Sequence, residues 1–272
     1  MSLKAWIRSA RTPSQLTIYL PLVLGQLFAP TFDGWIFVGV MAFAFFDHLY
    51  IVWGNDYADR GTDGRNPHPT PFGGGSRVLL DGSLHESQLA IAIPSAAFGL
   101  VMTTGLLVVG SGALVLVPLA VFALLLLWMY SYPPVRLSFR GGGEVLQMLG
   151  VGLVLPLYGY AAQASGAAGF PWWTLGVSLP LQLGTALATT RPDEIGDRLV
   201  DKRTLSVILG GPRASLVMLT SYGVALGFFA LRTGPTGALG VLALPLLFGG
   251  IALVTRSATP GRRSCSSTSS RG

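Results

Sequence analysis

Charged residues are scarce in this chain. Of its 272 residues, only 11% are Asp, Glu, Lys or Arg, whereas 51% are hydrophobic. Soluble globular domains carry about 25% charged residues, so this chain has too few to cover a surface that faces water all round. Cysteine is nearly absent as well. The single Cys265 excludes a disulfide framework or a cysteine metal site within one chain.

The hydrophobic residues are gathered in long runs that carry almost no charge. About 20 apolar residues are needed to cross a hydrocarbon core of about 30 Å, and a segment in lipid is helical because only its own backbone can satisfy its hydrogen bonds. The predicted spans are residues 14–31, 35–53, 88–109, 113–132, 145–163, 171–190, 214–231 and 237–255. We therefore expect an all-α, polytopic membrane helical bundle with eight transmembrane helices.

The basic residues predict the topology of this bundle. Of 18 Lys and Arg, 17 lie in the N-terminal segment, in the loops after the second, fourth and sixth spans, or in the C-terminal tail; Arg232 is the exception. The positive-inside rule places these regions in the cytoplasm and the chain in the cell membrane. The net charge of +6 then reflects orientation, and we expect no nucleic-acid partner because no basic stretch is interleaved with aromatic residues.

One membrane domain, residues 1–256, is expected, followed by a disordered Ser/Arg-rich tail at 257–272. The first 30 residues also have features of a secretory signal, since three basic residues precede an apolar run. Seven further spans favour a retained first helix. The two longest polar intervals, 54–87 and 191–213, both follow an even-numbered span and both face the cytoplasm.

Each of these two intervals contains the same acidic pattern. Oxygen-bearing side chains recur at i, i+4 and i+8, which places them on one face if the preceding helix continues past the membrane. They are Asn55, Asp59 and Asp63 in the first interval and Asp193, Asp197 and Asp201 in the second. Like charges at this spacing destabilise a helix, so we expect cations to neutralise them. Carboxylate oxygens of this kind suit Mg²⁺, which bridges carboxylates to substrate phosphates.

Membrane proteins normally keep their charges in such loops, and this ordinary explanation suffices for either interval alone. It does not suffice for the pair, because the two motif stretches, residues 55–63 and 193–201, hold seven of the twelve acidic residues of the chain. Basic residues in the same intervals, among them Arg60, Arg77 and Lys202, supply cations for phosphate oxygens. Acids for a metal beside cations for phosphate predict a diphosphate site.

A third cytoplasmic element, YSYPPVRL at residues 130–137, ends the fourth span. Alone it is typical of a helix stop with an interfacial aromatic belt and a positive-inside arginine. Beside the acidic intervals, its Tyr132 and Arg136 become candidates to contact the diphosphate.

These three segments, NDYADRGTD, YSYPPVRL and DEIGDRLVDKRTLSVILG, resemble in order and helix context the motifs of the UbiA superfamily of intramembrane prenyltransferases. The resemblance covers roughly residues 10–255 and implies a helical bundle around a central cavity, bound Mg²⁺ and a polyprenyl diphosphate donor. It also implies metal ligation by Asn55, Asp59, Asp63, Asp193, Asp197 and Asp201. Contacts to the diphosphate are implied for Arg60, Tyr132, Arg136 and Lys202.

Within that superfamily, KRTLSVILG at residues 202–210 is most similar to the 1,4-dihydroxy-2-naphthoate, or menaquinone-type, branch. The run GGGSRVL at residues 73–79, which includes Arg77, is similar to it as well, although a flexible glycine loop explains this run equally well. The expected reaction is transfer of a polyprenyl group to an aromatic acceptor in quinone biosynthesis, with Asp59, Asp193 and Asp197 as catalytic residues. The prenyl tail would lie among the helices or in membrane lipid.

Two features depart from the family pattern. Ser138 stands where members often have a lysine, so Arg136 or Arg140 would have to serve in its place. Members commonly have nine helices and eight are expected here, with the ninth missing. A shorter variant and a truncated, inactive chain both remain open.

Asp47 and His48 lie inside the second span, where a charge is expensive. Either a neighbouring helix satisfies the pair, or one of the two faces the cavity. In the second case, we expect Asp47 to join the catalytic residues by orienting a hydroxyl or carboxylate of the acceptor, or by accepting a proton.

Other functions fit the same motifs. One alternative is a UbiA-type enzyme that acts on 4-hydroxybenzoate, haem, chlorophyllide, glycerophosphate or a sugar phosphate, or that cyclises a terpene without an acceptor. A cation transporter would need further acidic residues at the bilayer midplane, where only Asp47 is present. A chain without its last helix would bind the donor without turning it over.

Overall fold

The structure of the protein is a computed structural model that describes residues 2–65 and 75–257, apart from the side chains of Arg65 and of residues 235–257. The described residues form helices and no strand, which confirms the all-α prediction. The chain divides into two units, residues 1–225 and residues 226–272. The predicted tail at 257–272 lies outside the described residues from position 258 onward.

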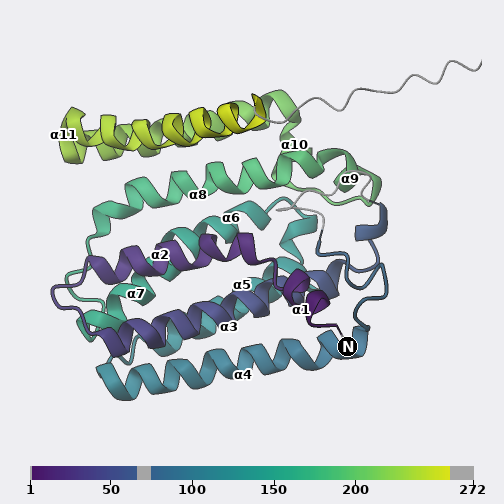
Figure 1. Ribbon diagram of the computed structural model, residues 1–272, viewed down its shortest axis with the longest axis horizontal. Helices are drawn as coiled ribbons and strands as arrows, with labels where there is room; N and C mark the ends of the chain where they lie inside the picture. The colour runs from purple at the N-terminus through teal and green to yellow at the C-terminus, as the bar shows by residue number, and fades with distance from the viewer. Residues whose placement is uncertain (1, 66–74, 258–272) are drawn as a thin grey trace, which may run out of the picture. The chain divides into compact units, whose positions relative to one another are not determined.

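Each of the eight predicted spans contains a helix (Figure 1). The α-helices are α1 (Leu3–Ser9), α2 (Leu16–Leu27), α3 (Gly34–Asp59), α4 (Glu86–Ser111), α5 (Leu116–Ser131), α6 (Gly143–Leu149), α7 (Leu155–Ala164), α8 (Leu175–Thr190), α9 (Glu194–Leu199), α10 (Leu205–Leu209) and α11 (Gly211–Ser257). A π-helical turn, Gly150–Val154, joins α6 to α7. Gly234 interrupts α11 with a positive φ of 78°, which separates the seventh predicted span from the eighth.

Four described stretches are long and apolar enough to cross a membrane by length and composition: Gly34–Asp59, Glu86–Ser111, Gly143–Ala164 and Gly211–Gly234. Three helices are shorter than their predicted spans, since α2 has 12 residues and α5 and α8 have 16 each. The reason at α2 and α8 is that a 3₁₀ turn precedes each of them, Thr12–Gln15 and Trp172–Thr174.

Helix α3 is the central element of the first unit, because it contacts α2, α4, α5 and α7. Asp33 caps its start by accepting hydrogen bonds from the backbone N–H groups of Trp35 (2.7 Å) and Ile36 (3.0 Å). The helix then runs for 26 residues to Asp59, which is about 39 Å. The second span therefore extends into the first acidic interval, as the spacing predicted.

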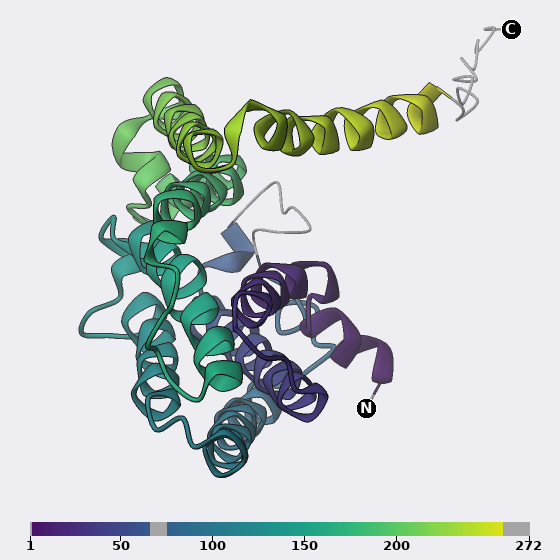
Figure 2. The ribbon, with the colours of Figure 1, turned by 90° about the vertical axis from the view of Figure 1, so that its left-hand side faces the viewer.

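Helices α2 and α7 pack against each other (Figure 2), and glycines lie at their contact. A side chain at Gly25 would run into the backbone carbonyl of Pro156, and one at Gly159 would run into that of Leu22. Small residues let membrane helices approach closely and gain van der Waals contact. These two glycines fix the distance between α2 and α7.

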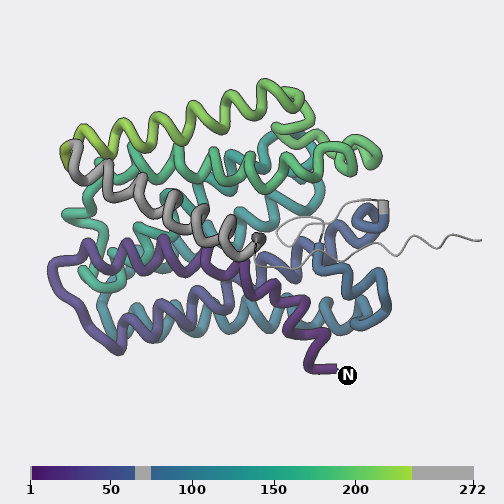
Figure 3. Tube along the Cα trace, turned by 45° about the horizontal axis from the view of Figure 1, so that its top comes forward, coloured from purple at the N-terminus to yellow at the C-terminus, as the bar shows by residue number. Residues whose placement is uncertain are grey.

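The interior of this unit combines apolar packing with a few paired polar groups. Phe43 of α3 stacks on Tyr158 of α7 with ring centroids 3.9 Å apart, and the Tyr158 hydroxyl lies 3.0 Å from Thr104 Oγ1 of α4. Residues 2–15 lie on the same side of the unit as the end of α3 and residues 75–85 (Figure 3), and Trp6 makes an edge contact with Trp53. The N-terminal segment is thus anchored beside the first acidic interval.

Candidate active site

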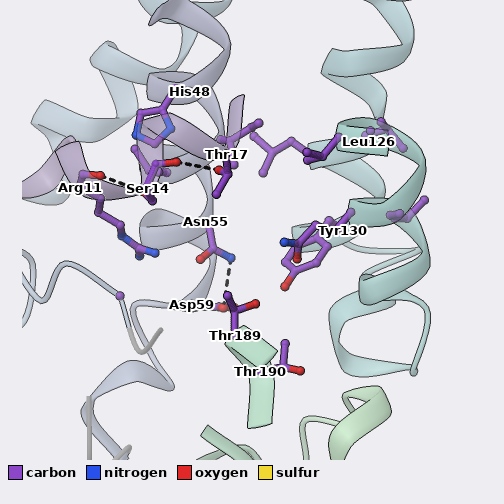
Figure 4. A pocket seen from close by; sticks show the side chains of 18 of the residues that line it. Arg11, Ser14, Thr17, His48, Asn55, Asp59, Leu126, Tyr130, Thr189 and Thr190 are labelled. Carbon is purple, nitrogen blue, oxygen red and sulfur yellow. Dashed lines mark hydrogen bonds between the residues drawn. The ribbon is translucent and has the colours of Figure 1, made fainter. Parts of the chain in front are cut away.

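A cavity of about 290 Å³ runs along the C-terminal half of α3 within the first unit. Its lining from α3 extends from Asp47 to Asp59, a stretch of about 18 Å of helix. The other walls come from the N-terminal segment, α2, α5, α6, the π turn, α7 and residues Thr189–Thr204. Both acidic intervals therefore border one cavity, although they are far apart in the sequence. Figure 4 shows Asn55 and Asp59 of the first interval near Thr189 and Thr190, which directly precede the second.

Asn55 and Asp59 lie one turn apart at the end of α3, as predicted. Asn55 Nδ2 lies 3.4 Å from both Asp59 Oδ2 and Ser131 Oγ of α5. Asp59 is only 3% exposed, and its Oδ1 has no hydrogen-bond partner in the part of the chain that the structure describes. A buried carboxylate oxygen without a donor is unfavourable, so this atom is available to a ligand.

Lys202 joins the two acidic intervals. Its Nζ lies 3.1 Å from Asp59 Oδ2 and 4.0 Å from Asp197 Oδ1. Burial lowers the pKa of Lys202, but the nearby carboxylate of Asp59 and that of Asp197 outweigh this effect and raise its pKa overall. The side chain is therefore an ammonium ion that holds the two carboxylates together.

Asp197 lies on α9, and Asp193 lies on the 3₁₀ turn before it, Arg191–Asp193. Both line the cavity. Thr204 Oγ1 donates a hydrogen bond of 3.1 Å to Asp197 Oδ2. Burial raises the pKa of Asp197 to about 6, although Lys202 and Thr204 act in the opposite direction.

Asp63 also lines the cavity, from the 3₁₀ turn Asp63–Arg65 beyond the end of α3. Burial, together with the charges of Asp59 and Asp56, raises the pKa of Asp63 to about 7. Gly75 approaches it closely at a positive φ of 73°, and a side chain there would run into Asp63 Oδ2. The expected helical face is therefore only partly correct, because α3 ends before the third position of the pattern.

Asp56, which lies between the motif positions, has a different environment. It forms an ion pair with Arg11, and it accepts hydrogen bonds from the backbone N–H of Ser76 (3.2 Å) and from the Ser76 hydroxyl. These contacts satisfy its carboxylate and connect the N-terminal segment to the residues after the first acidic interval. We assign Asp56 a structural role.

The donor set fits Mg²⁺. Within the described residues, one buried oxygen of Asp59 accepts no hydrogen bond. Asp63 and Asp197 have raised pKa values, and the Lys202 ammonium group already lies between carboxylates of the two intervals. No three acidic or histidine side chains within residues 2–65 and 75–257 are close enough together to enclose an ion by themselves. Mg²⁺ does not need such a cage, because it usually takes one or two carboxylates, several waters and substrate phosphates.

Among the described residues, five predicted site residues do not line the cavity: Arg60, Arg77, Tyr132, Arg136 and Asp201. Asp201 is exposed, with a positive φ of 56°, because α9 already ends at Leu199. Arg60 turns to Glu86, with Nε 2.9 Å from Oε2. The hydroxyl of Tyr132 donates to the Gly54 carbonyl at 2.9 Å, and Arg77 likewise lies off the cavity wall.

Arg136 follows the end of α5 in the chain and lies close to Asp59, although it is not among the described residues that line the cavity. Its Nη2 is 3.7 Å from Asp59 Oδ1, and its guanidinium carbon is 3.6 Å from the centre of the Phe139 ring. The structure thus places Arg136, like Lys202, beside the carboxylate at the end of α3.

Some cavity residues were not identified from the sequence. Arg11, Tyr130, Thr189 and Thr190 all line it, and Figure 4 shows Tyr130 on the side opposite Asn55. Arg11 gave no other signal than that of a positive-inside residue. Tyr130 belongs to the YSYPPVRL segment, where its neighbour Tyr132 was chosen instead, because helical phase alone does not say which tyrosine faces inward.

The sequence profile of the UbiA prenyltransferase family matches residues 18–268. The chain belongs to this family. The match confirms the prediction of a prenyltransferase and of a multi-pass membrane protein. No curated protein matches the chain in sequence.

Solved structures of UbiA homologues share the fold. A homologue from Archaeoglobus fulgidus bound to GPP and Mg²⁺ has a TM-score of 0.70 and 16% identity, over 94% of this chain and 89% of that one. Another structure described as a UbiA homologue from Archaeoglobus fulgidus has a TM-score of 0.68 and 15% identity, over 92% and 86%. An apo homologue from Aeropyrum pernix K1 has a TM-score of 0.62 and 18% identity, over 94% and 91%. The UbiA-like helical bundle is thereby confirmed.

Proposed function

We propose that this UbiA-family protein transfers a polyprenyl group from its diphosphate to an aromatic acceptor, with Mg²⁺ as cofactor. One observation carries the proposal: Lys202 lies 3.1 Å from Asp59, although the two residues are 143 positions apart. That contact brings both acidic intervals to one cavity. The homologue from Archaeoglobus fulgidus bound to GPP and Mg²⁺ supports the proposal for this chain.

Asn55, Asp59 and Asp63 on one side and Asp193 and Asp197 on the other would hold Mg²⁺. When bound, the metal supplies a positive charge that stabilises the departing diphosphate. Lys202 and Arg136 lie beside the same carboxylates and would bind phosphate oxygens through charge-assisted hydrogen bonds. Since Asp201 is turned away, we leave it out of this site.

The rest of the cavity suits the prenyl group. Apolar side chains line it, including Ile18, Ile51, Val151 and Leu155, and such walls keep water away from a carbocation. The C–O bond to the diphosphate breaks, and its electron pair leaves with the diphosphate. The face of the Tyr130 ring stabilises the positive charge that develops on the allylic carbon. A ring carbon of the acceptor then attacks that carbon, and the proton that this ring carbon loses passes to the released diphosphate.

We further propose 1,4-dihydroxy-2-naphthoate as the acceptor. The supporting observation is the segment KRTLSVILG at residues 202–210 together with GGGSRVL at residues 73–79. The bias of Lys and Arg supports a position in the cell membrane, with the N-terminus and both acidic intervals in the cytoplasm.

The first test uses membranes that contain the protein, a radiolabelled polyprenyl diphosphate and 1,4-dihydroxy-2-naphthoate, with Mg²⁺ or with EDTA. We expect a lipid-soluble labelled product that forms only with Mg²⁺. If product forms only with a different aromatic ring, such as 4-hydroxybenzoate, the proposed acceptor is wrong but the proposed prenyl transfer stands. Absence of product with every acceptor, and of Mg²⁺-dependent donor binding, would contradict the proposed function.

A further inference from the structure

Asp47 is a buried acidic residue that the diphosphate chemistry does not use. It lies on α3 two turns before Asn55 and lines the cavity. Its side chain belongs to a residue that is 1% exposed, and its Oδ1 has no hydrogen-bond partner among the residues that the structure describes. An acceptor atom in such surroundings is strongly unfavourable until a donor reaches it.

His48, the adjacent candidate, is already engaged. Its Nε2 donates to the backbone carbonyl of Ala10, at 2.8 Å, and this bond anchors the N-terminal segment on α3. His48 therefore has a structural role in the cavity wall. Asp47 is the residue of the pair that is left to face a ligand.

The place of Asp47 in the cavity determines which part of a ligand it meets. Asp59 lies about 18 Å from Asp47 along α3. It is the last residue of that helix, and the Lys202 ammonium group contacts it there. Between them α3 contributes Ile51 and Val52 to the lining. A diphosphate held at the Asp59 end thus leaves Asp47 to a different chemical group.

The chemistry of that group follows from the carboxylate. A hydroxyl donates a hydrogen bond to the orphaned oxygen, whereas a plain hydrocarbon leaves it unsatisfied. A ligand carboxylate at this position would place two like charges together in an apolar site. The Asp47 carboxylate thus favours a ligand ring that carries a hydroxyl at this position and disfavours one that carries a carboxylate.

We infer that Asp47 is a specificity-determining residue for the acceptor, which it recognises through a ring hydroxyl. This inference rests on the proposed function, since it assumes that an acceptor enters this cavity. For 1,4-dihydroxy-2-naphthoate it fixes the orientation: a hydroxyl faces Asp47 and the carboxylate turns away from it.

Equilibrium binding tests this without any turnover. Naphthalene, 2-naphthol and 2-naphthoate share one ring system and differ in one group. Each is titrated into the full-length protein in lipid nanodiscs. For the wild type we expect 2-naphthol to bind about tenfold more tightly than either of the others.

Two substitutions separate hydrogen bonding from charge. In Asp47→Leu, 2-naphthol and naphthalene should bind equally, because the acceptor atom is gone. In Asp47→Asn, the preference for 2-naphthol should persist, while 2-naphthoate should gain about tenfold because the like charge is removed and the amide can donate. Asp81→Asn is the matched control: it removes the same charge from an exposed ion pair with Arg8 and should leave all three affinities unchanged.

Binding of pyrophosphate with Mg²⁺ is measured on every variant as a check on the folded diphosphate site. If pyrophosphate binds but the Asp47 substitutions leave the ligand preferences unaltered, the role of Asp47 is refuted and the proposed function stands. If the wild type binds neither pyrophosphate nor 2-naphthol, the proposed function fails as well.

Discussion

At the scale of single residues, Lys202 is the feature that links sequence to mechanism. It is a cation between Asp59 and Asp197, which would repel each other without it. Asp201, one position earlier in the chain, faces solvent. Of these two neighbours in the sequence, Lys202 lines the cavity and Asp201 is exposed. Substitution of each residue tests this difference.

Lys202→Met should lower turnover by about tenfold to a hundredfold, because a buried charge-assisted contact to the diphosphate is lost. It should also lower the thermal stability of the metal-free protein, since the two carboxylates lose their counter-ion. Arg198→Met is the control, because Arg198 is 54% exposed and pairs with Glu194 on the surface of α9. Equal effects of the two substitutions, measured by a prenyl-transfer assay and by thermal unfolding, would contradict the bridging role.

Asp59→Asn and Asp201→Asn test which acidic residues hold the metal. The sequence pattern includes both residues, whereas in the structure Asp59 lines the cavity and Asp201 is exposed. We expect Asp59→Asn to reduce Mg²⁺-dependent turnover by at least about a hundredfold and Asp201→Asn to leave it within about twofold. The measurement is the initial rate against Mg²⁺ concentration. A large loss in Asp201→Asn would mean that residues 200–202 rearrange when the metal and diphosphate bind.

At the scale of elements, the cavity depends on how α2, α3 and α7 approach one another. The glycines at the α2–α7 contact allow backbones to touch, and α2 contributes Thr17 and Ile18 to the cavity wall. Glu144 at the start of α6 acts similarly on the second interval, since its Oε1 accepts a hydrogen bond of 2.9 Å from the backbone N–H of Leu205. The site is held by such contacts between elements.

Gly159→Ala should destabilise the protein by about 1–3 kcal/mol, because the added methyl group meets the Leu22 carbonyl and forces α2 and α7 apart. Gly105→Ala in α4 is the control: nothing lies within 4 Å of the added atom, and alanine is the better helix former by about 0.5–1 kcal/mol. Thermal unfolding in one lipid composition compares the two. Similar melting temperatures for both variants would show that the α2–α7 distance is not set by this glycine.

At the scale of the whole molecule, the site couples metal binding to folding and to pH. The ordinary pKa of an Asp is 3.8, and Asp63 and Asp197 have values of about 7 and about 6 in the folded, metal-free chain. In this range the folded chain binds more protons than the unfolded one, so the stability without metal falls as the pH rises. Mg²⁺ binds only the deprotonated carboxylates, so its affinity rises over the same range.

Thermal unfolding between about pH 5 and pH 8 should therefore show opposite trends. With EDTA, the melting temperature should fall as the pH rises toward 7. The increase caused by Mg²⁺ should be small at the acid end and largest at the alkaline end. A metal-induced shift that does not depend on pH would contradict a site built from these two carboxylates.

The sequence by itself determined the class of the molecule and the kind of chemistry. Long uncharged runs must be helices in a membrane whatever their packing, because lipid offers the backbone no partner. The acidic intervals predicted a cation and a diphosphate, because local clusters of like charge need a counter-ion. These conclusions depend only on residues that are near each other along the chain.

The tertiary structure decided which residues meet. It brought Lys202 to Asp59, placed Arg11 on Asp56 and turned Arg60 toward Glu86. It also left Asp47 Oδ1 without a hydrogen-bond partner in the described part of the chain. Because α3 and α9 end before the third position of each acidic pattern, Asp63 reaches the cavity from a 3₁₀ turn, whereas Asp201 is exposed and does not line it. Contacts between residues far apart in the chain depend on where helices stop and how they pack, and no local pattern encodes either.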